Sequence, residues 1–261
     1  MAIEPQVGIL RGLDVHPLEP ILLVYGDGGV CLLDAASLLP IWRNDELAVG
    51  CAKFAPDGRS ALLAQDWTQF WLLDTSTFVL APYGELREGI SSIAFNESEG
   101  IVAIVTGSQE GAGLFFANYR GGTLGQTSLD DLDFDSDSLL VAFSPDGRFL
   151  ACVDSVVRLY AFPSLEELAI FGSDVTKAAL GMVDSSWSNP MFSADSSHLI
   201  CQAPLGQIYF WHVASFELAA RVEGNGTPGK HLSLSPNGKR LVSLDSDGRL
   251  AMTELSWDEE P

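Results

Sequence analysis

A short phrase repeats along this chain at intervals of about 40 residues, and a repeat of that length restricts the fold more than any other feature of the sequence. Each copy is an apolar residue followed by a turn rich in Pro, Asp, Asn and Gly. The apolar residues, called landmarks below, are Val15, Phe54, Phe95, Phe143, Phe192 and Leu234. Their spacings of 39, 41, 48, 49 and 42 positions predict one supersecondary unit per copy, each stacked on its neighbours.

The residues that follow each landmark predict short β-strands. In the fourth copy, an apolar run at Arg148–Val153 leads through the polar pair Asp154–Ser155 into a second run, Val156–Phe162, and a third, Leu165–Phe171. Together with the strand before the landmark, this makes four strands per unit. In the turns, Pro fixes φ, Asp or Asn bonds its own backbone and Gly accepts a positive φ. No window between these breakers keeps a helical apolar period, so the sequence predicts an all-β fold.

Three blocks carry a family resemblance. FAPDGRSALLAQ, FSPDGRFLACVD and LSPNGKRLVSLDSDGRLAMTEL resemble the inner strands of WD-repeat propellers, and Leu33–Asp34, Leu73–Asp74 and Trp211–His212 occupy the place of the Trp-Asp pair. The resemblance implies a six-bladed β-propeller of four-stranded antiparallel blades that binds other proteins. We expect a single domain, 1–261, whose blades cover approximately 7–44, 49–86, 90–128, 138–173, 186–223 and 230–256 plus 2–6.

The repeat also predicts how the fold closes. The sixth copy ends after its third strand, Arg249–Leu255, whereas residues before the first landmark align with an outer strand. We therefore expect Ala2–Gln6 to pair beside Arg249–Leu255, which removes two exposed sheet edges. The landmark rings Phe54, Phe95, Phe143 and Phe192 share one phase of the repeat. They are expected to end inner strands and to be buried between blades.

Composition narrows the possible partners. The chain has 35 acidic and 14 basic residues, a formal net charge of -21, and this charge repels phosphate backbones and anionic membranes. An alternative explanation is that the acidic residues only keep the protein soluble, whatever it binds. The N-terminus carries no basic segment followed by an apolar stretch, so a cytoplasmic location is the default expectation. Cys31, Cys51, Cys152 and Cys201 lie singly in apolar runs, which predicts buried thiols rather than a zinc site.

Two insertions that the repeat does not require are the best candidates for a binding site, because loops carry recognition. They span 125–137 and 174–186, and both join the last strand of one blade to the first strand of the next. Such connections emerge on one face of a propeller. The first mixes aspartates with apolar anchors, as a basic partner would require. The predicted partner-binding residues are Asp130, Asp131, Leu132, Asp133, Phe134, Asp135, Asp137, Lys177 and Met182.

The sequence shows no pattern of residues typical of an active site, a metal site or a cofactor site. His16, His198, His212 and His231 fall in separate strands or corners, and residues 130–137 lack the spaced ligand pattern of a calcium loop. The sequence thus predicts no catalytic residue, no cofactor and no metal site. Two alternatives to a scaffold stay open: an acidic immunity protein or inhibitor that neutralises a basic toxin or enzyme, and a hydrolase or lyase with a site in the central channel.

Overall fold

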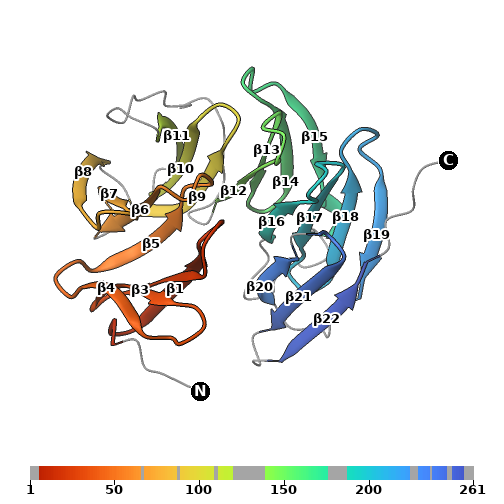
Figure 1. Cartoon of the computed structure of the whole chain (residues 1–261). Coiled ribbons are helices and arrows are strands. Elements are labelled where there is room, and N and C mark those ends of the chain that lie inside the picture. The colour runs from red at the N-terminus through yellow and green to blue at the C-terminus, as the bar shows by residue number, and fades with distance from the viewer. Residues whose placement is uncertain are drawn as a thin grey trace. The chain divides into compact units, whose positions relative to one another are not determined.

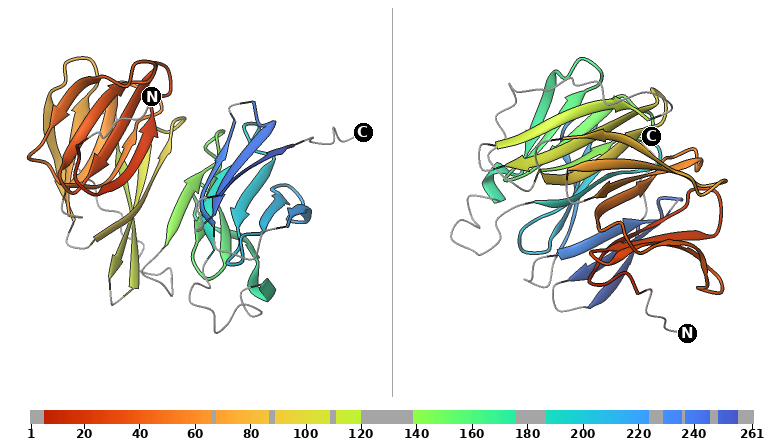
Figure 2. Two further views of the ribbon diagram at one scale, coloured as in Figure 1. Left: turned by 90° about the horizontal axis from the view of Figure 1, so that it is seen from below. Right: turned by 90° about the vertical axis from the view of Figure 1, so that its left-hand side faces the viewer.

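The structure, a computed structural model, describes residues 6–65, 68–86, 89–108, 111–119, 139–175, 187–223, 229–235, 237–245 and 249–255. The chain divides into two compact units, Met1–Asp133 and Phe134–Pro261. Each unit holds three antiparallel sheets, which can be followed by their labels in Figure 1. The strands within a sheet twist, as both views of Figure 2 show.

The first unit contains sheets 1 to 3, and in each of them strands adjacent in sequence are paired. Sheet 1 consists of β1 (Leu10–Val15), β2 (Ile21–Gly26), β3 (Gly29–Asp34) and β4 (Pro40–Asn44). Sheet 2 consists of β5 (Val49–Phe54), β6 (Ser60–Gln65), β7 (Gln69–Asp74) and β8 (Leu80–Glu85). Sheet 3 has three described strands, β9 (Gly89–Asn96), β10 (Ile101–Ser108) and β11 (Gly111–Asn118).

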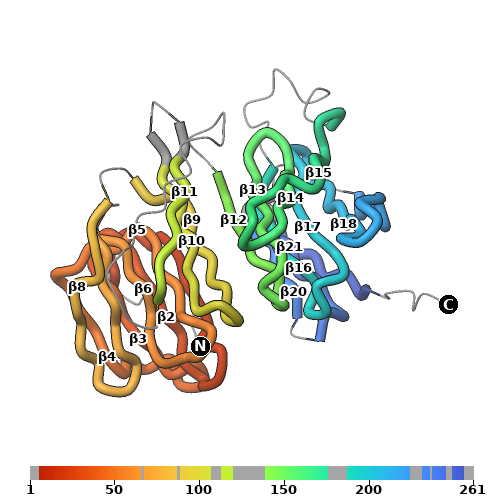
Figure 3. The backbone as a smooth tube through the Cα atoms, turned by 90° about the horizontal axis from the view of Figure 1, so that it is seen from above, coloured from red at the N-terminus to blue at the C-terminus, as the bar shows by residue number. Residues whose placement is uncertain are grey.

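The second unit contains sheets 4 to 6 with the same connectivity. Sheet 4 consists of β12 (Leu140–Phe143), β13 (Phe149–Val153), β14 (Val157–Ala161) and β15 (Glu167–Phe171). Sheet 5 consists of β16 (Ser188–Phe192), β17 (His198–Gln202), β18 (Ile208–His212) and β19 (Leu218–Val222). Sheet 6 has three described strands, β20 (Gly229–Leu234), β21 (Arg240–Asp245) and β22 (Leu250–Glu254). Figure 3 shows β13, β14 and β15 side by side.

The landmarks mark the same structural position in all six sheets. Five of them end the first strand of their sheet, and Phe95 stands one residue before the end of β9. Within each unit, the first strands of successive sheets pack on one another: β1 on β5 and β5 on β9, then β12 on β16 and β16 on β20. The prediction that the landmarks end inner strands is therefore confirmed within each unit.

The apolar core lies between successive sheets. One cluster joins sheets 1 and 2 through Leu23, Leu32 and Leu63, and another joins sheets 4 and 5 through Leu159 and Leu199. All five side chains have no exposed surface. Because each sheet presents an apolar face to the next, the stacking buries side chains on both faces of the middle strands.

The expected burial of the four phenylalanine landmarks is half right. Phe54 and Phe192 are buried between sheets, whereas Phe95 and Phe143 are partly exposed. The reason is a local aromatic partner: the Phe95 ring packs edge-on against Tyr119 at 4.9 Å, and the Phe143 ring against Phe162 at 5.0 Å. Phe95 also packs against the apolar cluster that joins sheets 2 and 3, so it lies between sheets but is not fully buried.

Of the segment predicted to close the fold, the structure describes Gln6, and residues 2–5 lie outside the described part. The Gln6 carbonyl accepts a hydrogen bond of 2.8 Å from Arg43 of β4. Val7 follows and is 1% exposed in a cluster with Val24 and Cys31 of sheet 1. The chain thus enters β1 along sheet 1, and the pairing of Ala2–Gln6 with Arg249–Leu255 stays a prediction.

Candidate functional site at the base of the insertions

All nine predicted partner-binding residues lie outside the described residues: Asp130, Asp131, Leu132, Asp133, Phe134, Asp135, Asp137, Lys177 and Met182. The structure does describe Leu139, which follows the first insertion, and Gly172 and Trp187 on either side of the second. Tyr119, the last described residue before the first insertion, follows β11 and donates its N–H to the Gly100 carbonyl, at the other end of sheet 3. The geometry of these flanks establishes where the insertions are attached.

The described flanks of the two insertions lie at one end of sheet 4. Leu140, three residues after the first insertion, pairs with Val153 at the end of β13. Phe171, three residues before the second, pairs with Val157 at the start of β14. Val153 and Val157 flank the β13–β14 turn, and Trp187 at the far end of the second insertion donates its N–H to the Asp154 carbonyl of that turn at 2.9 Å.

Trp187 pins the two ends of the second insertion together. Its side chain is 1% exposed, and its ring packs on Tyr209 at 5.1 Å and on Trp211 at 5.4 Å. Gly172 lies directly against it with a φ of +78°, and a Cβ atom built at Gly172 would be 2.3 Å from Cζ2 of Trp187. A side chain at position 172 is therefore opposed by both the backbone conformation and the ring.

A buried ion pair supports the same turn. The Asp154 side chain has no exposed surface, and its carboxylate accepts bonds from Nη1 of Arg158 at 3.1 and 3.2 Å and from the Val156 N–H at 2.9 Å. Arg158 is 17% exposed, and its Nε lies 3.8 Å from Glu167 on β15. Because the carboxylate is fully desolvated, it depends on these donors, and they fix the turn from which Trp187 is held.

Three other connections between consecutive sheets are much shorter than the second insertion. Residues 45–48 join β4 to β5, residues 86–88 join β8 to β9 and residues 223–228 join β19 to β20, whereas residues 172–187 join β15 to β16. Residues 173–175 of this connection are helical. Joining strands in this fold therefore takes only a few residues, and the connection 172–187 is longer than that.

Sequence reasoning missed Trp187, Asp154 and Arg158. The available signal was a tryptophan at the last position before a strand, together with an aspartate and an arginine four residues apart across a hairpin turn.

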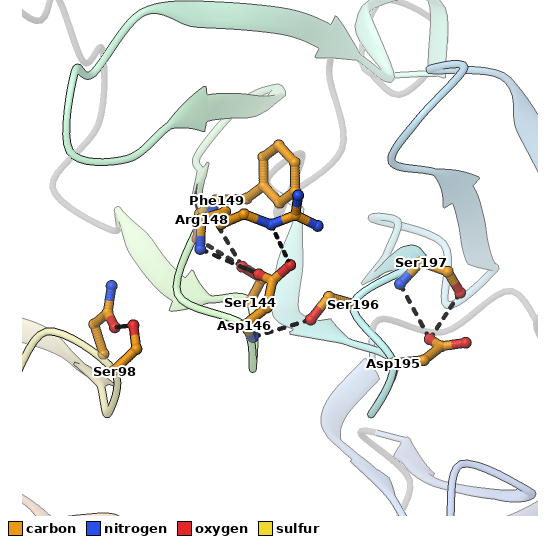
Figure 4. Close-up of polar contacts among 9 residues, drawn as sticks. Ser98, Ser144, Asp146, Arg148, Phe149, Asp195, Ser196 and Ser197 are labelled. Carbon is orange, nitrogen blue, oxygen red and sulfur yellow. Dashed lines mark hydrogen bonds and ion pairs between the residues drawn. The ribbon is translucent and has the colours of Figure 1, made fainter.

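At the other end of the sheets, carboxylates are used to build turns. In Figure 4, Ser144 donates its hydroxyl to Asp146 at 2.6 Å, and the Asp146 N–H donates to Ser196 Oγ of the next sheet at 3.1 Å. Asp195 accepts bonds from Ser193 Oγ at 2.5 Å and Ser197 Oγ at 2.7 Å. The hydrogen bond from Ser193 is the largest influence lowering the pKa of Asp195 to about 2.

Three of the described histidines make defined contacts, and three of the thiols are desolvated. His16 accepts the Glu19 N–H at Nδ1 over 2.9 Å, and its Nε2 lies 2.8 Å from the Gly58 carbonyl, so Nε2 carries the proton. The rings of His198 and His212 pack at 4.5 Å. Burial raises the pKa of Cys51 to about 11 and raises the pKa values of Cys152 and Cys201 further, which keeps these thiols protonated and poorly nucleophilic.

Two kinds of feature are absent from the described residues: a cluster of metal ligands and a membrane-spanning helix. Across these ranges, no three His, Cys, Asp or Glu side chains come close enough together to ligate a metal ion. None of the helical segments in the described part has the length and hydropathy needed to cross a lipid bilayer.

Comparison with solved structures settles the fold. The β-propeller domain of Cps50 (Swd1) from Myceliophteria thermophila aligns over 95% of this chain and 84% of its own, with a TM-score of 0.74 and 16% identity. The fold is a six-bladed β-propeller. The resemblance to WD-repeat propellers inferred from the sequence is confirmed for the fold.

Two further propeller neighbours have equally low identity. A chain of the mitotic checkpoint complex aligns over 97% of this chain and 77% of its own, with a TM-score of 0.76 and 17% identity. A chain of the hydrazine synthase from Kuenenia stuttgartiensis aligns over 95% and 84%, with a TM-score of 0.77 and 15% identity. No protein-family model matches the sequence, and no curated protein matches it.

Proposed function

We propose that this propeller is a non-catalytic scaffold or adaptor and that a protein partner docks on the face that bears the two insertions. The observation that carries the proposal is the long connection 172–187, whose ends are clamped by Trp187 and Gly172 at the same end of sheet 4 from which β12 departs. A loop with a fixed base is a suitable recognition element, because its attachment is rigid while its sequence is free to vary.

The proposed contacts follow from residue chemistry. Asp130, Asp131, Asp133, Asp135 and Asp137 attract a basic partner over long range, and exposed charges of this kind act mainly on the rate of encounter. Leu132, Phe134 and Met182 supply the apolar contact that persists after encounter, and Lys177 adds a single positive charge on the second insertion.

The neighbouring structures support a role in assembly. One of them is a chain of the mitotic checkpoint complex, a multi-protein assembly. Their identities are too low to transfer a partner, so the partner is defined here by its chemistry, a protein with a basic surface.

A second candidate function is favoured by the net charge of -21. A strongly acidic domain can neutralise a basic toxin or enzyme by covering its active site, as an immunity protein or inhibitor does. The two functions differ in how binding responds to salt, because screening at high ionic strength weakens a contact dominated by charge more than an apolar one.

The proposal is tested by an affinity pull-down from the native host at low and high salt, with two loop variants. One variant replaces residues 126–137 and the other replaces residues 174–186 by short Gly-Ser linkers, leaving Gly172 and Trp187 in place. A stoichiometric partner that is captured by the parent and lost from either variant supports the insertion face. Retention at high salt favours the adaptor, and elution favours the inhibitor. A partner captured equally by all three proteins would place the binding site elsewhere.

A further inference from the structure

The turn between the first two strands of sheet 6 differs from the equivalent turns in charge. In sheets 2, 4 and 5 this turn carries a carboxylate, Asp57, Asp146 and Asp195, whereas sheet 6 has Asn237. The backbone pattern is kept: Ser235 donates its hydroxyl to Oδ1 of Asn237 at 2.8 Å, and the Lys239 N–H donates to the same oxygen at 3.1 Å. The exchange of Asp for Asn therefore removes a negative charge without altering the turn.

The same exchange leaves an amide donor available. Both protein donors bind Oδ1 of Asn237, which is the role that a carboxylate oxygen of Asp146 fills in sheet 4. Asn237 is exposed, and the remaining polar group on its side chain is Nδ2. An amide nitrogen in this position has two N–H bonds to offer.

Two cationic side chains follow the turn, and the carboxylate nearest to Arg240 pairs with it only weakly. Lys239 and Arg240 are consecutive and exposed. Arg240 lies 4.0 Å from Glu254, and the two side chains are 62% and 79% exposed, so the pairing is weak. In sheet 4, by contrast, Arg148 is held by Asp146 at 2.7 Å.

These groups line one pocket. It has a volume of about 550 Å³ and is bordered by Ser235, Asn237, Lys239, Arg240, Glu254 and Leu255. All six of these lining residues belong to sheet 6 and its turn, within the second unit. The first-to-second strand turn lies at the opposite end of a sheet from the connections that carry the insertions.

We propose that this pocket binds an oxyanion, a carboxylate or a phosphate group, presented by a partner molecule. Lys239 and Arg240 supply the charge, and Asn237 supplies a directed N–H bond, a combination that favours oxygen anions. The net charge of -21 repels anions at long range, so any anion that binds is held by local groups. This inference does not depend on the insertion face.

Two probes test it on the full chain: a fluorescein-labelled pentaglutamate peptide followed by anisotropy, and inorganic phosphate as a competitor. We expect saturable peptide binding that is lost in the double variant Lys239→Gln/Arg240→Gln and weakened about tenfold or more in Asn237→Asp. Asp146 and Asp195 show that this turn accepts a carboxylate, so Asn237→Asp is expected to melt like the parent. Displacement by phosphate identifies phosphate as a ligand, and binding without displacement identifies the carboxylate.

Matched controls remove cations from the equivalent turns. Arg59→Gln and Arg148→Gln change the overall charge in the same direction, and we expect each to leave peptide affinity within about twofold of the parent, because exposed single charges contribute little. Absence of saturable binding to either probe, parent-like affinity in the Asn237 and Lys239/Arg240 variants, or an equal loss in the Arg59 and Arg148 controls would each overturn the assignment.

Discussion

Four of the described non-glycine residues with a positive φ, a conformation that usually belongs to glycine, lie in equivalent turns. Leu38, Phe78, Leu165 and Phe216 have φ values of +59°, +58°, +57° and +61°, at the same place in the third-to-fourth strand turns of sheets 1, 2, 4 and 5. Each donates its N–H to the carbonyl four residues earlier, as in Phe216 to His212 at 2.9 Å. The turn therefore selects residues by backbone conformation as well as by packing.

Phe216 allows that conformational preference to be measured. We expect the free energy of unfolding of Phe216→Asn to be about 1 kcal/mol higher than that of Phe216→Val. Asn tolerates a positive φ, whereas a β-branched residue resists it. Chemical denaturation of the two variants gives the difference. Leu218, which lies on β19 and is 53% exposed, is the matched control, and there Val should equal or exceed Asn. A Val variant as stable as the Asn variant at position 216 would show that the positive φ has no cost.

Asp195 links stability to pH. Its pKa is about 2 in the folded protein and 3.8 in its ordinary state, so its ionised form stabilises the fold above about pH 4 and this contribution disappears as the pH falls toward 2. Asp195→Asn should therefore destabilise the protein at pH 6 and have a much smaller effect at pH 2.5, as measured by thermal melting. Asp57→Asn is the control, because residue 55 is Ala and supplies no hydroxyl. Equal effects of Asp195→Asn at both pH values would contradict the assignment.

At the scale of single elements, the base of the second insertion can be tested by substitution at Gly172. We expect Gly172→Ala to cost about 1 to 3 kcal/mol, because of its positive φ and the contact with Trp187. The cost should fall in a Trp187→Leu background, which removes the ring but keeps the strained φ, and a double-mutant cycle measures this coupling. In a Trp71→Leu background the cost should be unchanged, since Trp71 belongs to sheet 2. If the stability changes of Gly172→Ala and Trp187→Leu simply add, the proposed contact between Gly172 and Trp187 has no energetic role.

The strands could be predicted from the sequence because the same pattern of apolar and turn-forming residues recurs in every copy of the repeat. Each landmark is followed by a turn whose Pro, Asp and Gly residues act locally, so the first strand of every sheet ends where expected. Contacts that depend on distant residues could not be predicted in the same way. Phe95 and Phe143 look identical to Phe54 in sequence, yet they pack on Tyr119 and Phe162.

The candidate sites also could be predicted only where they depend on strand order and not on contacts between distant residues. The attachment of both insertions follows from strand order, and the flanks at Leu140, Phe171 and Trp187 lie at the predicted end of sheet 4. The buried pair Asp154–Arg158 and the charge of the turn at Asn237 become visible only when the sheets are compared in space.

At the scale of the whole molecule, the predicted closure is open to a direct test. Replacing residues 1–5 by a Gly-Ser stretch of equal length keeps the bond between Gln6 and Arg43 while removing the strand predicted to pair beside Arg249–Leu255. We expect a lower melting temperature, by roughly 2 to 4 °C for each kcal/mol of pairing lost. A variant that melts at the temperature of the parent would show that Ala2–Gln6 does not complete the last blade.

The central claim is that the insertion face is where a partner docks. It is tested most directly by the association rate constant of the captured partner as a function of salt. Changing Asp130, Asp131, Asp133, Asp135 and Asp137 to Asn should slow association and flatten its salt dependence, and leave dissociation nearly unchanged. Neutralising five acidic residues in turns at the other end of the sheets should have little effect: Glu19, Asp57, Glu97, Glu99 and Glu217. Equal association rates for the parent and the five-aspartate variant at every salt concentration would contradict the account.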